Sequence, residues 1–143
     1  QDPLPLTIAC IHTTDGKHFS VHGTHEHFFI YTKKDHKIKN QPLNDIPIGL
    51  GLTESTKENY LSSKSIHLNI GDILFITTDG LTEATKEGTP NNKEFSENKI
   101  KSIITENAHK PVESIQESLL SELNKFTNNT QKDDITFILI KGK

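Results

Sequence analysis

Near the middle of the chain lies the segment Gly71-Asp72-Ile73-Leu74-Phe75-Ile76-Thr77-Thr78-Asp79-Gly80-Leu81-Thr82-Glu83-Ala84. A Gly-Asp turn opens it, and an unbroken apolar and β-branched run follows, a pattern typical of a strand buried on both faces. The strand ends at Asp79, which a glycine follows. An acid in that place has a fixed backbone and lies at the rim of a sheet, which suits a metal ligand or a catalytic carboxylate. Asp-Gly pairs also form ordinary strand-ending turns, so the dipeptide alone leaves both interpretations open.

Length and charge limit the class of protein. The chain has 143 residues and a net charge of −3. This length predicts one domain, residues 1–143, with one core. The charge gives no general attraction for nucleic acid or an anionic membrane, and no apolar run approaches the ~18 residues of a membrane span. All 16 basic residues are lysine. Without arginine, the usual clamp for phosphate, a metal or a lysine must hold any phosphate that is bound.

The single cysteine bears on the compartment. Cys10 lies in the apolar run of residues 6–11 and is predicted to be a small buried hydrophobe that forms no internal disulfide. A reducing compartment, the cytoplasm, is therefore expected, with a membrane anchor elsewhere in the parent protein left open. The chain holds no methionine and starts Gln1-Asp2-Pro3, so we expect it to have been cut from a longer protein.

The remaining chain predicts an α+β fold. Strands are expected at residues 5–12, 17–23, 27–31 and 36–40, and their short turns indicate an antiparallel meander. Residues 40–59 are expected to be mostly loop, with an ordered apolar crossing at 46–50, before a strand at 65–70. Two helices follow the central segment, and a last buried strand is expected at residues 135–140. We therefore expect antiparallel β-sheets flanked by helices.

The two helices are predicted from apolar spacing. In the first, Phe95, Ile100, Ile103 and Ile104 fall on one face, and a shorter helical turn is expected before it, from Leu81. The second begins at Pro111 and carries the clearest amphipathic stripe, whose members recur at three- and four-residue spacing: Val112, Ile115, Leu119, Leu123 and Phe126. This stripe is expected to cover one face of a sheet.

A second acidic segment, the pair Asp133-Asp134, directly precedes the last predicted strand. If this strand is an antiparallel neighbour of the one that ends at Asp79, the end of one lies beside the start of the other, and the carboxylates meet at one rim. Oxygen ligands of this kind favour Mg²⁺ or Mn²⁺. Alternatively, the pair only keeps charge next to an aggregation-prone strand.

Several of these segments together resemble a known family. The central segment resembles the "GDxLLLYTDGxTEA" motif of bacterial metal-dependent serine/threonine phosphatases, the SpoIIE/RsbU branch of the PPM family. Residues 133–136 resemble its "DDxT", and Phe95 the apolar residue of its "EFGxxRL". Residues 23–26 are similar to its "AGHxP" loop, although Thr24 stands where a glycine is usual, and residues 46–50 are similar to its "PLGL". The order and spacing of these motifs agree over nearly the whole chain.

The resemblance implies a fold, a reaction and a site. The fold would be part of the PPM αββα sandwich, and two Mn²⁺ or Mg²⁺ ions would hold a water that attacks the phosphorus of phosphoserine or phosphothreonine. Asp79 and Asp133 match metal-ligating positions, and Asp134 matches a neighbouring position that varies in the wider family. Gly80 and His25 match loop or backbone positions. The implied partners are a phosphorylated regulatory protein, such as an anti-sigma-factor antagonist, and a sensor domain upstream in the parent chain.

One family motif has no counterpart. The first half of the family domain carries a "DVxGHG"-like motif, and nothing in residues 1–14 resembles it. We therefore interpret the chain as an N-terminally truncated phosphatase domain that is inactive alone. The second hypothesis is a catalytically inactive relative that serves as a protein-binding or signal-relay module.

Histidines crowd into a short part of the chain. His18, His22, His25 and His27 lie within ten residues. Neutral imidazoles bind Zn²⁺, although a structural zinc site usually takes four ligands with a recognisable spacing. The alternative is that these side chains cover the polar faces of strands.

Overall fold

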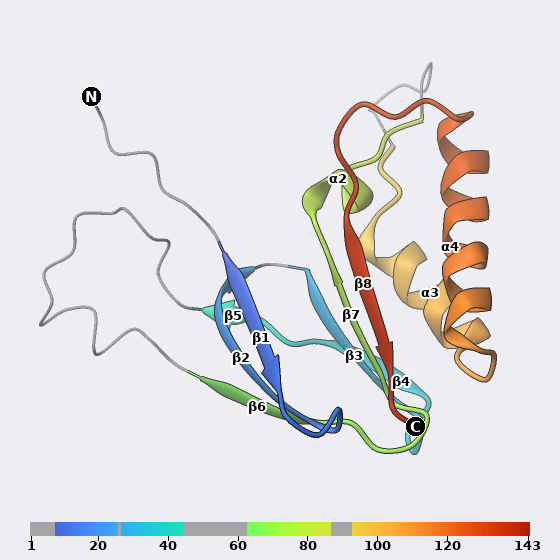
Figure 1. Ribbon diagram of the computed structural model, residues 1–143. Coiled ribbons are helices and arrows are strands. Elements are labelled where there is room, and N and C mark those ends of the chain that lie inside the picture. Colours follow the sequence, from blue (N-terminus) through green and yellow to red (C-terminus); the bar gives the residue numbers. More distant parts are fainter. Residues whose placement is uncertain (1–7, 26, 45–62, 87–92) are drawn as a thin grey trace, which may run out of the picture.

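The computed structural model describes residues 8–25, 27–44, 63–86 and 93–143, and for His25 and Asn44 it describes the backbone only. The predicted crossing at residues 46–50 lies outside the described residues. Figure 1 shows three layers: an outer sheet, an inner sheet and a pair of helices. Antiparallel sheets with helices on one side confirm the predicted α+β class.

The outer sheet is built around β2 (His18–His25), which pairs with β1 (Ala9–Thr13), β5 (Leu43–Asn44) and β6 (Lys64–His67). All of these pairings are antiparallel. β1 and β2 form a hairpin around Asp15-Gly16, in agreement with the short turn expected between the first two strands. Phe19, Val21 and Ile66 point from this sheet toward the inner sheet and are buried. Apolar residues of β2 and β6 thus form one half of a core between the two sheets.

The inner sheet has the order β4 (Lys37–Asn40), β3 (Phe28–Thr32), β7 (Ile73–Thr77), β8 (Phe137–Lys141), and all neighbours are antiparallel. Every residue of β7 is buried, which confirms the prediction of a strand covered on both faces. Leu74 and Ile76 face the outer sheet, whereas Ile73 and Phe75 face the helices.

The predicted meander is wrong at one connection. β1 pairs with β2 and β3 pairs with β4, but β2 and β3 belong to different sheets. The two hairpins stack face to face, because Val21 of β2 and Phe28 of β3 are buried in the same apolar cluster. Short turns occur both between strands paired in one sheet and between strands of two stacked sheets. The spacing of turns therefore does not distinguish the two arrangements.

The helical layer contains α3 (Glu97–Asn107) and α4 (Val112–Thr127), and a single turn, α2 (Asp79–Thr82), follows β7. Both predicted long helices are confirmed, but Phe95, predicted on the face of the first, precedes α3 and is buried outside it. The short helical turn α2 starts at Asp79 and not at Leu81. Ile115, Leu119 and Leu123 of the predicted α4 stripe are buried against the inner sheet. Burial of each such side chain contributes about 1.5–3 kcal/mol, so this stripe holds α4 on the sheet. No helix among the described residues is both long and apolar enough to span a membrane.

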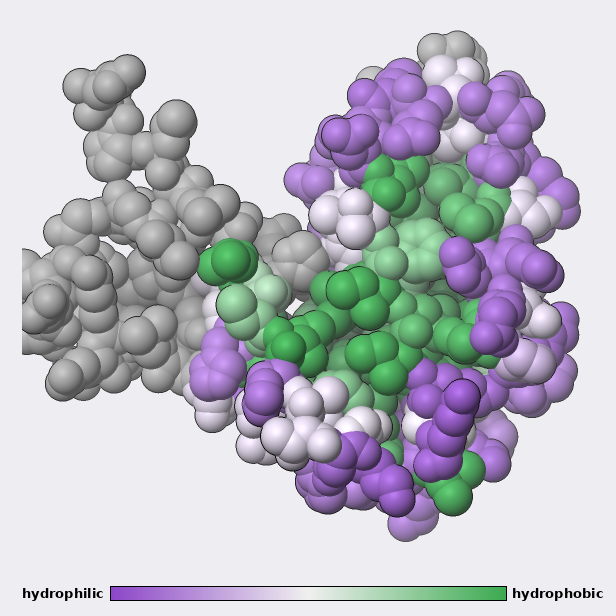
Figure 2. Space-filling view, viewed as in Figure 1, coloured by the Kyte–Doolittle hydropathy of each residue, from purple (hydrophilic) through white to green (hydrophobic). Residues whose placement is uncertain are grey.

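Strand β8 differs from its prediction as a buried strand. It begins at Phe137, none of its residues is fully buried, and Ile138 is 49 % exposed. The sheet order makes β8 an edge strand of the part that the structure describes. Figure 2 shows hydrophobic side chains gathered in the middle of the face where β1 and β8 lie. An apolar run predicts a strand, but it does not say how many neighbours the strand has.

Cys10 also departs from its prediction, because its side chain is exposed. It lies on β1 between Ala9 and Ile11, both of which pack against the core between the sheets. Successive side chains of a strand point to opposite faces, so Cys10 points outward. The predicted burial was therefore wrong.

The turn before β7 is held by a buried acid. Asp72 is 4 % exposed, and its carboxylate accepts hydrogen bonds from the backbone N–H groups of Lys33 (2.8 Å) and Asn69 (3.0 Å). Both donors lose this partner in Asp72→Ala, and a hydrogen bond to a charged group contributes about 1.5–3 kcal/mol. We expect this variant to unfold with a free energy lower by about 2 kcal/mol in chemical denaturation. Asp35→Ala, at an exposed turn position, is the matched control and should stay near the parent.

Candidate metal and phosphate site

The end of β7 meets the start of β8, because the two strands are antiparallel neighbours, the condition stated above for Asp79 and the Asp133-Asp134 pair. Thr77 is the register partner of Phe137. Beyond the ladder, the N–H of Thr78 donates to the carbonyl of Thr136 (3.0 Å), and the N–H of Thr136 donates to the hydroxyl of Thr78 (3.1 Å). These bonds fix the residue before Asp79 to the residues that follow Asp133 and Asp134. The segments that carry the predicted metal ligands are therefore neighbours.

Gly80 makes the closest approach between the two segments. A Cβ atom built on Gly80 would lie 2.3 Å from the carbonyl oxygen of Asp134. No side chain fits that space, so the backbone contact requires glycine. Gly80 thus lets α2 lie directly on the segment that precedes β8.

The three predicted carboxylates lie at the surface. Asp79, Asp133 and Asp134 are all exposed, and Oδ1 of Asp133 accepts the N–H of Asp134 at 2.7 Å. Within the described residues, no group of three or more His, Cys, Asp and Glu side chains is arranged to hold a metal. Carboxylate oxygens at adjoining strand ends fit the ligand preference of Mg²⁺ and Mn²⁺. As a donor set they supply part of such a site, and further ligands must complete it.

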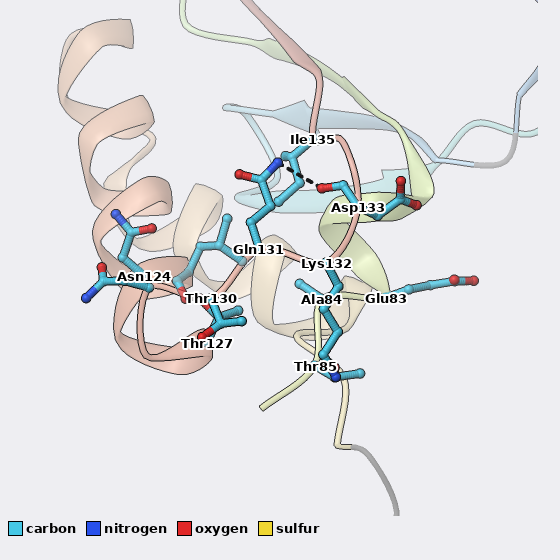
Figure 3. A pocket seen from close by; sticks show the side chains of 13 residues that line it. Glu83, Ala84, Thr85, Asn124, Thr127, Thr130, Gln131, Lys132, Asp133 and Ile135 are labelled. Atoms are coloured by element: carbon cyan, nitrogen blue, oxygen red, sulfur yellow. Dashed lines mark hydrogen bonds between the residues drawn. The ribbon is translucent and has the colours of Figure 1, made fainter. Parts of the chain in front are cut away.

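A cavity of about 350 Å³ adjoins this rim. Figure 3 shows it between α4, which contributes Asn124 and Thr127, and the loop that carries Gln131 and Asp133. The amide of Gln131 donates to the carbonyl of Asp133 (2.8 Å) and so shapes the loop. In this view the carboxylate of Asp133 extends away from the α4 side chains. The cavity therefore lies on the α4 side of Asp133, away from its carboxylate. A second, open hollow is lined by residues 131–134.

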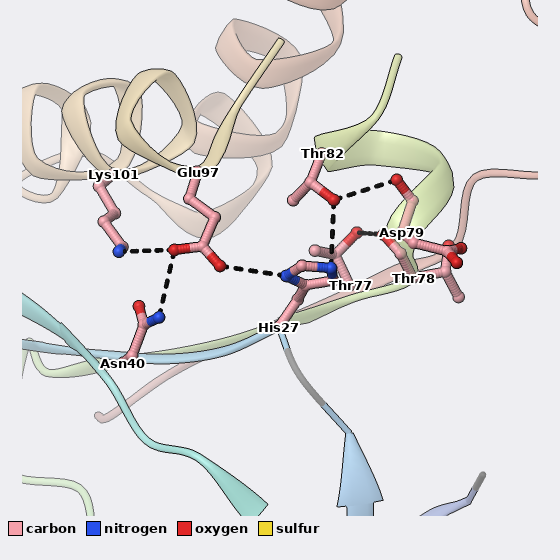
Figure 4. A network of polar contacts seen from close by, with 8 residues as sticks. All are labelled: His27, Asn40, Thr77, Thr78, Asp79, Thr82, Glu97 and Lys101. Carbon is pink, nitrogen blue, oxygen red and sulfur yellow. Dashed lines mark hydrogen bonds and ion pairs between the residues drawn. The ribbon is translucent and has the colours of Figure 1, made fainter. Parts of the chain in front are cut away.

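A polar network lies on the other side of α2 and centres on His27 (Figure 4). Its Nδ1 is 3.2 Å from Oε1 of Glu97 on α3, and its Nε2 is 3.2 Å from the hydroxyl of Thr82 on α2. The Thr82 hydroxyl in turn lies 3.1 Å from the carbonyl oxygen of Asp79. A continuous set of polar contacts therefore runs from α3 to the backbone of the first predicted ligand.

Glu97 is held by three neighbours. Besides His27, it accepts hydrogen bonds from the ammonium of Lys101 (2.9 Å) and the amide of Asn40 (3.2 Å). Burial raises the pKa of the Glu97 carboxyl, but these hydrogen bonds outweigh burial and leave the pKa below its ordinary value. Lys101 is itself placed over the ring of Phe29, 5.0 Å from its centroid. Glu97 is therefore a fixed carboxylate anion.

The sequence did not predict this network. His27 and Thr82 are 55 residues apart, and His27 and Glu97 are 70 apart. In the sequence, His27 stands out only as one of four clustered histidines, and no local pattern indicates its partners. The backbone of His25 ends β2 opposite Leu43, and its side chain lies outside the described residues.

The zinc alternative gains no support from the described residues. His18 bonds to Asp15 (2.6 Å) and lies against the ring of His67, whereas His27 belongs to the network at α2. His22 is an exposed residue of the outer sheet. The metal-ligating side chains in the described ranges form no group of three or more.

Comparison with known proteins gives the family to which the chain belongs. Residues 4–143 match the family described as Stage II sporulation protein E (SpoIIE). Because this match spans nearly the whole chain, the chain belongs to the SpoIIE family. No curated protein matches the sequence.

Solved structures of phosphatase domains share the fold. The SiaA-PP2C domain of Pseudomonas aeruginosa superposes with a TM-score of 0.69 at 16% identity, covering 89% of this chain and 47% of that one. The RsbU and RsbW domains of Rv1364c from Mycobacterium tuberculosis give 0.69 at 21% identity, covering 94% and 35%. The manganese-presoaked SpoIIE phosphatase domain from Bacillus subtilis gives 0.61 at 16% identity, covering 95% and 56%. The chain thus spans about half or less of the SiaA and Rv1364c chains.

Proposed function

We propose that this chain contributes to a metal-dependent phosphoprotein phosphatase that hydrolyses phosphoserine or phosphothreonine on a regulatory partner protein. The observation that supports the proposal is the hydrogen-bonded junction of β7 and β8, at which the segment that carries Asp79 adjoins the segment that carries Asp133 and Asp134. Membership of the SpoIIE family supports the reaction class. A phosphorylated anti-sigma-factor antagonist is the kind of substrate we propose.

The residues of this chain would position the metal and not act as acid or base. Asp79 and Asp133 would be ligands, with Asp134 beside them, and Gly80 would let their two segments touch. Divalent ions supply a nucleophilic hydroxide near neutral pH and neutralise phosphoryl oxygens. That chemistry needs no arginine, which agrees with a chain whose 16 basic residues are all lysine. Lys132, which lines the hollow beside Asp133, would attract the phosphate.

Metal dependence is the direct test of this function. We expect the full-length protein to hydrolyse p-nitrophenyl phosphate and a phosphoserine peptide with Mn²⁺ or Mg²⁺ added, and to lose turnover in excess chelator. Activity should return when Mn²⁺ is restored in excess. Full activity in chelator would contradict the proposal, because the carboxylates would then have no ion to hold. The isolated chain of residues 1–143 should show little or no turnover.

A second function is favoured by the incomplete donor set. In the ranges that the structure describes, no three metal-ligating side chains come together. A protein with this geometry in its full-length form would be a binding or relay module that recognises the regulatory partner without dephosphorylating it. The hydrolysis assay decides between the two functions, because such a module would release no phosphate at any Mn²⁺ concentration.

A further inference from the structure

The contacts of His27 tie three elements together. The residue directly precedes β3, its side chain is only 14 % exposed, and it lies between Glu97 of α3 and Thr82 of α2. Thr82 is 5 % exposed, so its hydroxyl is shielded from water. The backbone of the same residue also joins the two helical segments, because the N–H of Ser96 donates to the carbonyl of Thr82 (3.0 Å). Any shift of α3 is therefore transmitted to α2.

The single hydrogen of the Thr82 hydroxyl can be donated to only one acceptor, so its direction depends on whether Nε2 of His27 carries a hydrogen. A hydroxyl has one hydrogen to donate, so Thr82 donates either to the Asp79 carbonyl or to Nε2 of His27. When Nε2 carries a proton, it donates to Thr82, and the Thr82 hydrogen is left for the carbonyl of Asp79. Nδ1 faces Glu97, a carboxylate that only accepts, so Nδ1 is the donor in that contact. The Thr82 hydroxyl is thus the shared partner through which His27 and the Asp79 carbonyl are linked.

Asp79 depends on this backbone for its orientation. Its carbonyl accepts both the Thr82 hydroxyl (3.1 Å) and the N–H of Glu83 (2.8 Å). The side chain itself is exposed, and Figure 4 shows it directed away from His27. The bonds on its carbonyl therefore fix the turn that carries the carboxylate, and they leave the carboxylate oxygens to a ligand.

We propose that His27, oriented by Glu97, is a positioning residue that fixes α2 through Thr82 and so holds Asp79 in its metal-binding orientation. This inference rests on the proposed function for the metal, but the fixing of α2 does not require a metal.

We call the contacts Glu97–His27 and His27–Thr82 the relay, and three substitutions separate these two contacts. His27→Gln extends an amide nitrogen about as far as Nε2 and keeps a donor for Thr82, whereas His27→Asn reaches only about as far as Nδ1 and keeps the contact with Glu97. Thr82→Val removes the hydroxyl and keeps the shape. Glu106→Gln is the matched control. Glu106 is an exposed carboxylate of α3, the helix that carries Glu97, and it accepts a hydrogen bond from Ser102.

The first measurement uses metal-free, full-length protein. Amide hydrogen exchange at Glu83, whose N–H donates to the Asp79 carbonyl, should be about fivefold faster in His27→Asn and Thr82→Val, since about 1 kcal/mol of local stabilisation is lost. It should change little in His27→Gln and in the Glu106→Gln control. Thermal unfolding of each variant checks that it is folded. Unchanged exchange in folded His27→Asn would overturn the relay.

The second measurement is Mn²⁺ affinity by electron paramagnetic resonance. We expect binding about tenfold weaker in His27→Asn and in Thr82→Val, no further loss in the double variant, and near-parent binding in His27→Gln. Faster exchange with unchanged Mn²⁺ affinity would overturn the positioning role. If the parent protein itself binds no Mn²⁺, the proposed function and the positioning of a metal ligand both fail, and the exchange data still decide whether the relay fixes α2.

Discussion

Asp79→Asn is expected to lower Mn²⁺-dependent hydrolysis of p-nitrophenyl phosphate by at least about 100-fold, the loss that follows removal of one preorganised electrostatic group from an active site. The substitution keeps the size of the side chain and removes its negative charge. Asp79 is exposed, so the fold itself should be little affected. Steady-state rates in the full-length protein, over a series of Mn²⁺ concentrations, measure the effect.

The control for this variant is Asp35→Asn, which removes one charge from an exposed turn between β3 and β4. Its rate should equal that of the parent. A partial recovery of Asp79→Asn at high Mn²⁺ would agree with weakened ion binding. Parent-like turnover of Asp79→Asn at every Mn²⁺ concentration would remove Asp79 from the site.

Gly80→Ala is expected to disturb both the fold and the site. The added Cβ would lie 2.3 Å from the carbonyl oxygen of Asp134, and backbone is on both sides of the contact. Either α2 or the segment before β8 must move, which costs about 2–3 kcal/mol by analogy with overpacked cores. Because that movement separates Asp79 from Asp133, we expect Mn²⁺-dependent turnover to fall at least tenfold, by about 1.4 kcal/mol or more in transition-state free energy.

Gly16→Ala provides the matched control. Gly16 has a positive φ of +69°, but a Cβ there would meet nothing within 4 Å. The cost is then only the left-handed backbone, about 1–2 kcal/mol, and the turnover should not change. Equal turnover in the two glycine variants would show that the contact between Gly80 and Asp134 is not needed at the site.

The fold was predictable where one local pattern dominates. The apolar run of β7 and the stripe of α4 each predict an element and its buried face, and both predictions are confirmed. A local apolar pattern does not predict burial where burial depends on how many strands or helices lie beside the element. β8 has a sequence as apolar as β7, yet Ile138 is 49 % exposed. Cys10 lies in an apolar run, but strand alternation turns it outward.

The site was predictable to the extent that it is made of strand ends. Asp79 and Asp133 flank apolar runs, so antiparallel pairing of the runs was enough to predict that the two segments meet, and the register of β7 with β8 confirms it. The network of His27, Thr82 and Glu97 could not be predicted, because α3 and the residue that precedes β3 become neighbours only when the helices pack on the inner sheet. Its residues are of ordinary types with no diagnostic spacing.

Calorimetric titration of Mn²⁺ into the full-length protein tests the central claim most directly, because it measures the ions without requiring turnover. We predict saturable binding in the parent, and binding weakened at least about tenfold in both Asp79→Asn and Asp133→Asn, since each loses one anionic oxygen ligand. Asp35→Asn should bind as the parent does. Parent-like Mn²⁺ binding in both variants would contradict the claim that the acids at the ends of β7 and β8 hold the metal.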